Sequence, residues 1–169
     1  MNRNRWSQSA GVVLGAALLL AQVPAAAPDS AGTLVVRTSD GGQLTSLALP
    51  ADGHWCLLWH HSVQGFQVED CYRVADGQLL LNSSHTPDFA AGLGHTPGRG
   101  RLLSDTEHGY RIVDIDAPVP ANHFLLRVGS RRVDHRIQVG ARVVSLSQLA
   151  AGERVEIQLI PPTDGAPSP

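Results

Sequence analysis

The sequence predicts an all-β protein, built as a single antiparallel β-sandwich or a partly closed β-barrel of about 8–10 short strands. Short apolar runs alternate with turn signals across residues 31–160, which is the pattern of strands joined by tight turns. No long window in this part keeps the period of an amphipathic helix. The 17 glycines and 11 prolines also favour turns over long helices.

The expected strands follow from this alternation in chain order. The first two flank the turn Asp40-Gly41-Gly42, and the third and fourth form a hairpin. Residues 143–149 are ambiguous, and residues 146–151 are expected to form at most one helical turn. The strands are expected at Thr33–Arg37, Gln43–Leu49, His54–Ser62, Gln67–Val74, Gln78–Asn82, Tyr110–Ile115, Phe124–Val128, Val133–Val139 and Arg154–Ile160.

Two segments lack this alternation. Residues 83–104 are rich in glycine, histidine and proline and have little periodicity. A segment of that length without regular structure is usually functional or disordered, so we expect a long loop there. Residues 161–169 are rich in proline, glycine and serine, and they are expected to form an unstructured tail.

The beginning of the chain predicts export. Arg3 and Arg5 precede an apolar run at residues 11–22 and a row of small residues at 24–27, which is the layout of a secretory signal over residues 1–27. We therefore expect a periplasmic protein whose only membrane contact is this segment, with an uncleaved anchor as the alternative. Without the signal, 11 basic residues stand against 15 acidic ones, so no basic surface for nucleic acid is expected.

Residues 53–74 are the most informative part of the chain, because they hold two tryptophans, two adjacent histidines and both cysteines. Side chains alternate between the two faces of a strand. The face expected to join the core carries Trp55, Leu57, Trp59, Val68, Tyr72 and Val74. The opposite face then gathers His60, Ser62 and Glu69.

The two cysteines lie on neighbouring strands of this hairpin, and an exported protein should oxidise them where geometry permits. A turn at Val63-Gln64 places Cys56 directly across from Cys71. A turn at Gln64-Gly65 makes them diagonal, and glycine at the second turn position favours that register. We expect a Cys56–Cys71 disulfide, with a pair of buried free thiols as the alternative.

The polar residues of the hairpin allow a catalytic interpretation, in which Glu69 orients His60 and the histidine activates Ser62. Polar side chains are, however, expected on the solvent face of any sheet. The chain also has no G-x-S-x-G motif to expose a nucleophile on a sharp turn. A Ser/His hydrolase is therefore kept as an alternative, and no residue is assigned as catalytic.

Histidine is frequent, and neutral imidazole is a common metal ligand. The eight histidines are His54, His60, His61, His85, His95, His108, His123 and His135. None of them has the H-E-x-x-H spacing, and the cysteines lack C-x-x-C spacing. We expect no specific metal site and no cofactor, with a metal-dependent hydrolase as a further alternative.

The run of small residues at 89–94 includes Ala91, Gly92 and Leu93. One interpretation is a backbone cradle for an anion, since successive free N–H groups bind anions. The other is a close crossing of chains where only small residues fit. Arg99 and Arg101 follow soon after and could pair with a carboxylate.

Together these residues resemble a family of small exported bacterial proteins known as domain of unknown function 1850. The resemblance begins with His61-Ser62-Val63, followed by Val68-Glu69-Asp70 and Tyr72. It continues with Phe89, Ala91-Gly92-Leu93 and Gly109-Tyr110, and it ends with the Leu125–Val128 strand and His135.

The resemblance implies an all-β extracytoplasmic accessory protein linked to solute uptake, because such proteins are often encoded beside TAXI-type TRAP transporters. It favours His61, Ser62 and Glu69 as the polar site in place of His60. Simple alternation puts His61 and Glu69 on opposite faces, so a β-bulge near Gly65 is expected to bring them together.

The sequence thus leads to one functional hypothesis and two alternatives. We expect a non-catalytic periplasmic accessory protein, or a module that binds a small solute or a partner, linked to a TRAP-type (TAXI) uptake system. The expected partner is a transporter subunit or a small carboxylate solute, bound by His61, Ser62, Glu69, Ala91, Gly92, Leu93, Arg99 and Arg101. The alternatives are a hydrolase and a purely structural envelope protein.

Overall fold

The structure is a computed structural model, and it describes residues 30–88, 96–105 and 109–162. The expected signal segment, the glycine-containing run with Ala91, Gly92 and Leu93, and most of the expected tail lie outside these residues. Among the described residues, no helix is long and apolar enough to cross a bilayer.

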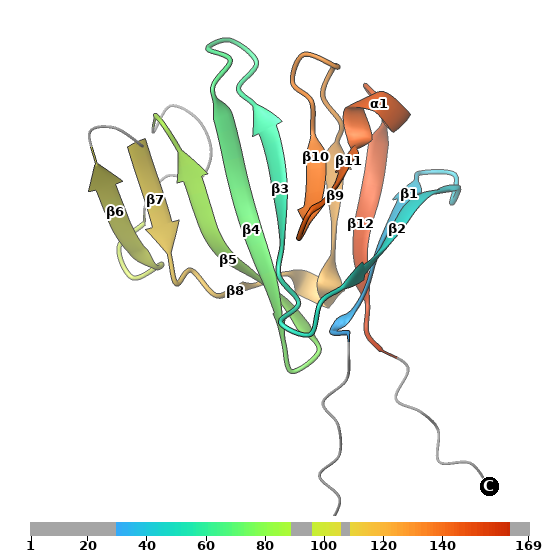
Figure 1. Ribbon diagram of the computed structural model, residues 1–169, viewed down its shortest axis with the longest axis horizontal. Coiled ribbons are helices and arrows are strands. Elements are labelled where there is room, and N and C mark those ends of the chain that lie inside the picture. Colours follow the sequence, from blue (N-terminus) through green and yellow to red (C-terminus); the bar gives the residue numbers. More distant parts are fainter. Residues whose placement is uncertain (1–29, 89–95, 106–108, 163–169) are drawn as a thin grey trace, which may run out of the picture.

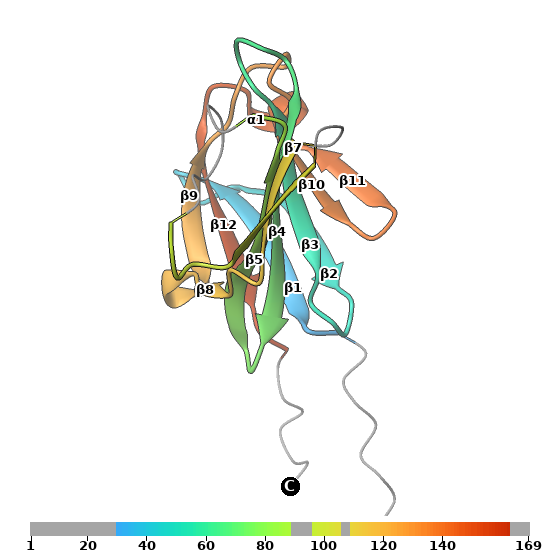
Figure 2. The ribbon, with the colours of Figure 1, turned by 90° about the vertical axis from the view of Figure 1, so that its left-hand side faces the viewer.

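The described residues form two antiparallel sheets (Figure 1, Figure 2). The small sheet has the order β2-β1-β12-β9, with β2 at Gln43–Leu49, β1 at Gly32–Thr38, β12 at Arg154–Ile160 and β9 at His123–Arg127. The large sheet has the order β11-β10-β3-β4-β5-β7-β6, and the short β8 (Ala117–Pro118) pairs with β5. Its other strands are β11 (Arg142–Ser145), β10 (Arg136–Val139), β3 (Trp55–His60), β4 (Gln67–Ala75), β5 (Gln78–Thr86), β7 (Gly109–Val113) and β6 (Arg101–Asp105).

The predicted all-β fold is confirmed, and of the two expected architectures the sandwich is the one found. The core lies between the sheets and consists mainly of aliphatic residues from alternating strand positions. Trp55 is fully buried at its centre and stacks on Tyr72 with ring centroids 4.4 Å apart. Phe124 of β9 lies 6.4 Å from Trp55, so this aromatic group joins the two sheets.

In the residues that the structure describes, helical structure is limited to two short pieces. The 3₁₀ turn η1 spans Pro120–Asn122, and the helix α1 spans Leu146–Ala150. The Ser145 hydroxyl caps α1 by accepting a hydrogen bond from the Gln148 N–H (3.2 Å). The expected helical turn at residues 146–151 is therefore confirmed, and the ambiguous segment before it supplies the strand β11.

The long loop expected at residues 83–104 is shorter than predicted. Strand β5 continues to Thr86, and β6 begins at Arg101. The prediction missed this extension because Ser84 and Thr86 are polar yet face inward and are buried. A register shift between Cys71 and Tyr72, where β4 pairs with β5, also interrupts the alternation along β5.

Candidate functional site

The β3–β4 hairpin places the two cysteines directly opposite each other. Cys56 pairs with Cys71 in the ladder, their Cα atoms are 4.1 Å apart, and they form a disulfide. This is the register expected for a turn centred on Val63-Gln64, and the diagonal register expected for a turn at Gln64-Gly65 is wrong. The loop is wider than two residues, because the His61 N–H donates to the Phe66 carbonyl and the Gly65 N–H donates to the His61 carbonyl.

His61 and Ser62 belong to this loop. The His61 ring stacks on Phe66 with centroids 5.1 Å apart, and its Nδ1 accepts a hydrogen bond from the Gln64 N–H (3.2 Å). Ser62 is exposed at the next position. Within the part of the chain that the structure describes, no hydrogen bond joins Ser62 to His61 or to Glu69.

Glu69 lies farther along β4 on the outer face of the large sheet. It pairs with Leu58 on one side and with His85 on the other. Its Oε1 lies 3.4 Å from Cys71 Sγ, a contact without a hydrogen bond because a disulfide sulfur carries no proton. The β3–β4 register runs unbroken from Trp55 to His60, so the bulge expected near Gly65 is not found and Glu69 shares its face with His60.

The two arginines expected to bind a carboxylate lie at the far side of the large sheet. Arg99 is exposed in the turn before β6. Arg101 lies on β6, an edge strand of the large sheet, and its guanidinium forms an exposed ion pair with Asp114 at 2.6 Å. Part of the charge expected for a ligand is therefore already paired within the protein.

The inner face of the large sheet holds a carboxyl group among apolar side chains. Asp70 of β4 lies between Leu57 of β3 and Ser84 of β5. Asp70 Oδ1 and Ser84 Oγ are both shielded from solvent, and neither meets the geometry of a hydrogen bond, although the Ser84 hydroxyl lies close enough to Asp70 to act on its pKa. Since buried polar atoms are nearly always hydrogen-bonded, this pair, which we call the inner-face site, needs an explanation.

The electrostatics of the inner-face site reflect its burial. Removal from water raises the pKa of the Asp70 carboxyl above its ordinary value; the nearby Ser84 hydroxyl opposes this rise and the Glu69 charge adds to it. Burial also raises the pKa of the neighbouring Tyr72 hydroxyl, and the Asp70 charge raises it further. Trp55 Nε1 is a third buried atom on this face without a partner. The face thus offers a carboxyl acceptor, a hydroxyl and an indole donor.

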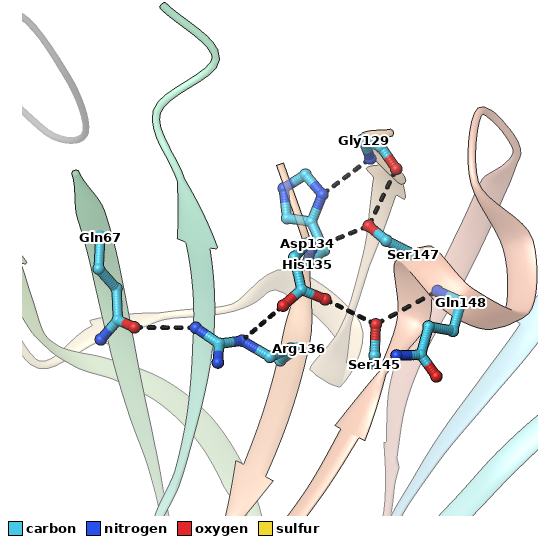
Figure 3. Close-up of polar contacts among 8 residues, drawn as sticks. All are labelled: Gln67, Gly129, Asp134, His135, Arg136, Ser145, Ser147 and Gln148. Carbon is cyan, nitrogen blue, oxygen red and sulfur yellow. Dashed lines mark hydrogen bonds and ion pairs between the residues drawn. The ribbon is translucent and has the colours of Figure 1, made fainter. Parts of the chain in front are cut away.

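A second polar cluster connects the start of β10 to α1 (Figure 3). Asp134 has a left-handed backbone (φ 50°) and accepts a hydrogen bond from the Ser145 hydroxyl at 2.7 Å. Its other oxygen forms an ion pair with Arg136 Nε at 3.3 Å. The Arg136 guanidinium in turn donates to the Gln67 side-chain oxygen at 2.8 Å, which ties β10 to the hairpin.

His135 fixes the loop between β9 and β10 in the same cluster. Its Nδ1 accepts from the Gly129 N–H (2.8 Å), and its backbone N–H donates to Ser147 Oγ (2.9 Å) (Figure 3). The Ser147 hydroxyl donates to the Gly129 carbonyl (2.9 Å). Burial lowers the pKa of the His135 imidazole, and the Asp134 charge opposes this effect. These contacts make His135 a neutral structural acceptor.

The comparisons with known proteins add one finding. A family model described as "Domain of unknown function (DUF1850)" matches residues 56–146. The chain belongs to this family. No curated protein and no solved structure matches it.

The DUF1850 match runs from Cys56 in β3 to Leu146 at the start of α1. It therefore contains the disulfide, the inner-face site and the His135 cluster. It leaves out β1, β2 and β12, which are three of the four strands of the small sheet. The structural unit is thus larger than the matched part of the chain.

Sequence reasoning assigned no binding role to the inner-face site. The sequence places Asp70 on the core-facing side of its strand, and a carboxyl in such a position is itself a signal. The position of Ser84 could not be read in the same way, because the register shift beside Cys71 changes which β5 residues face inward.

Proposed function

We propose that this DUF1850 protein is a non-catalytic binding module of the cell envelope that serves a TRAP-type (TAXI) uptake system. In this proposal it holds a small solute, or a segment of a transporter subunit, at the inner face of the large sheet. One observation carries the proposal: Asp70 and Ser84 are paired on the inner face of the large sheet, and each has a shielded oxygen that meets no hydrogen-bond geometry.

The physical argument is the free energy of an unsatisfied buried group. Leaving a buried donor or acceptor without a partner costs about 1–3 kcal/mol, and more when the group is charged. A ligand that supplies the missing donor recovers this free energy on binding. The site is therefore suited to a group that donates hydrogen bonds, such as an ammonium or an amide N–H.

This chemistry narrows the expected class of solute. A plain dicarboxylate would place like charge against Asp70, and Arg101 is already paired with Asp114. An amino-acid-like solute carries both a carboxylate and an ammonium, and its ammonium is complementary to Asp70. We therefore favour amino-bearing carboxylates over dicarboxylates. The disulfide supports an oxidising, exported location, and the link to a transporter rests on the family resemblance.

Thermal-shift measurements with amino acids and with dicarboxylates test the solute form of the proposal, because a ligand that binds only the folded state raises the melting temperature. We expect amino acids to raise the melting temperature of the wild type and to leave that of Asp70→Asn unchanged. Glu69→Gln is the matched control, because Glu69 neighbours Asp70 on the same strand but faces outward.

The partner form is tested by a pull-down from membranes with the same variants. Capture of a transporter membrane subunit by the wild type and by Glu69→Gln, but not by a folded Asp70→Asn, supports it. Loss of binding in Glu69→Gln alone would move the site to the outer face. Absence of both a stabilising solute and a captured subunit would contradict the proposal.

A further inference from the structure

The outer face of the β3–β4 hairpin brings together three side chains that bind metal ions in other proteins. One nitrogen of His54 and the sulfur atoms of Cys56 and Cys71 all lie within 4.8 Å of one another. His54 is exposed, Cys56 is partly exposed and Cys71 is buried. This cluster lies on the opposite face of the sheet from Asp70, so it is independent of the inner-face site.

The local backbone explains why His54 lies beside the cysteines. Gly53 has a left-handed backbone (φ 63°), and a Cβ there would lie 2.5 Å from Val74 Cβ. Only glycine lets the turn pass this close to the end of β4. The His54 N–H then donates to the Asp52 carboxylate at 3.0 Å. Because His54 and Cys56 are two residues apart, both side chains project from the same face.

We propose that reduction of the Cys56–Cys71 disulfide converts this cluster into a binding site for Zn²⁺, with His54, Cys56 and Cys71 as ligands. Thiolate and imidazole are the preferred zinc ligands, at about 2.3 Å and 2.0–2.1 Å respectively. In a tetrahedral site these bond lengths place ligand atoms roughly 3.4–3.8 Å apart. The His54 nitrogen already lies within 4.8 Å of both sulfur atoms. The sulfur atoms are 2.03 Å apart in the disulfide, so they must move apart by roughly 1.5 Å after reduction to reach this geometry. A fourth position stays open.

The disulfide keeps the site closed, because its sulfur atoms have no thiolate charge to offer a metal. A dithiol reductant opens it by attack of one thiolate on Cys56 Sγ, which breaks the S–S bond and releases Cys71 as a thiolate. The second thiol of the reductant then displaces Cys56, and the reductant becomes a disulfide. Two electrons pass to the protein. Zn²⁺ binding releases the thiol protons and leaves the oxidation state of the metal unchanged.

The surroundings favour a cation at this position. The Glu69 carboxylate lies 3.4 Å from Cys71 Sγ, and it contributes negative charge beside the two thiolates. Arg73, two residues from Cys71 on the same face of β4, is engaged by Asp116 at 3.1 Å. Opposite charges within a few ångströms attract appreciably at a partly buried surface.

The test titrates metal into the full chain reduced with a phosphine, which does not supply a competing thiol. We expect the reduced wild type to bind one Zn²⁺ in competition with a chromophoric chelator, and Co²⁺ to give the absorption of a tetrahedral thiolate complex. The oxidised wild type should bind none. His54→Asn should weaken Zn²⁺ binding at least tenfold, while His60→Asn, on the same face of β3, should leave it unchanged.

Three results would overturn the inference. The first is a reduced wild type that binds no more Zn²⁺ than the Cys56→Ser/Cys71→Ser double variant. The second is a His54→Asn variant that binds as tightly as the wild type. The third is seen by circular dichroism: a reduced chain that unfolds and does not regain its β spectrum when Zn²⁺ is added. Recovery of the spectrum with Zn²⁺ would support the site.

Discussion

Asp70 is a carboxyl group in a position where its neighbours along the strand, Val68 and Tyr72, are buried. Its raised pKa means that the folded state binds the proton more tightly than the unfolded chain does. The stability this provides is fully present below about pH 4, the unfolded pKa. It is lost as pH rises through the folded pKa. Ionised Asp70 is therefore a destabilising group near neutral pH.

Asp70→Asn should remove this dependence on pH. We expect the free energy of unfolding of the variant, relative to the wild type, to rise between pH 4 and pH 8. Urea denaturation at several pH values measures it, with Glu69→Gln as the control on the other face of β4. If the difference in the free energy of unfolding between Asp70→Asn and wild type does not change with pH, this account is contradicted.

His135 carries the opposite linkage. Its pKa is lowered, so the neutral imidazole stabilises the fold above about pH 6.5, and this stabilisation is lost as pH falls through the folded pKa. Protonation would also remove the acceptor that Nδ1 offers to the Gly129 N–H. We expect the NMR titration of the His135 ring to have a midpoint below about 6.5, the ordinary pKa of a histidine. A midpoint at or above that value would show that the Gly129 contact does not hold the neutral form.

At the scale of single residues, the sequence predicted positions that depend only on alternation. Cys56 and Cys71 could be paired in this way, because both lie on regular strands of one hairpin. The partner of Asp70 could not be predicted, since Ser84 follows the register shift. The contacts of His135 were also out of reach, because they join a loop to Ser147, 12 residues farther along the chain.

The β3–β4 hairpin is the element that the disulfide restrains. The cysteines are 15 residues apart in sequence, and closing a loop of that size is worth about 3 kcal/mol in the chain-entropy account. We expect Cys56→Ser/Cys71→Ser to lower the free energy of unfolding by about this amount in urea. His54→Asn in the oxidised protein is the control and should change it little. A loss well under 1 kcal/mol would mean that the ladder alone fixes this register.

Elements were predicted well where the alternation is simple and poorly where it is not. The strands β2 and β12 begin and end at the expected residues. Strand β6 was missed because Leu102 and Leu103 are adjacent and both exposed at the edge of the sheet, which removes the apolar/polar pattern. The polar end of β5 was missed because its buried residues are serine and threonine.

The whole molecule depends on pairing between the two ends of the chain. Strand β12 lies between β1 and β9 in the small sheet. The described part of β9 therefore pairs there with β12, a strand that lies outside the DUF1850 match. The three small-sheet strands outside the match also supply seven of the 19 buried residues of the core cluster. These seven are Leu34, Val36, Leu47, Leu49, Val155, Ile157 and Leu159.

A fragment limited to residues 56–146 should therefore not fold alone. It would expose the inner face of the large sheet and lose nine buried side chains of the core, Trp55 and Ala150 included. The free energy lost with them exceeds the small margin by which domains are stable. We expect a cooperative urea transition for residues 30–162 and none for the fragment, measured by circular dichroism. A cooperative transition in the fragment would show that the large sheet is an independent unit.

The antiparallel pairing of β1 with β12 has a further consequence for how the molecule can be attached. Thr33 pairs with Ile160, so the chain enters and leaves the sandwich side by side, at the end opposite the β3–β4 loop (Figure 1). A tether at either end would therefore hold the protein in the same orientation, with His61 and Ser62 pointing away from the point of attachment. Immobilised protein would present that loop to the solution whichever terminus is coupled.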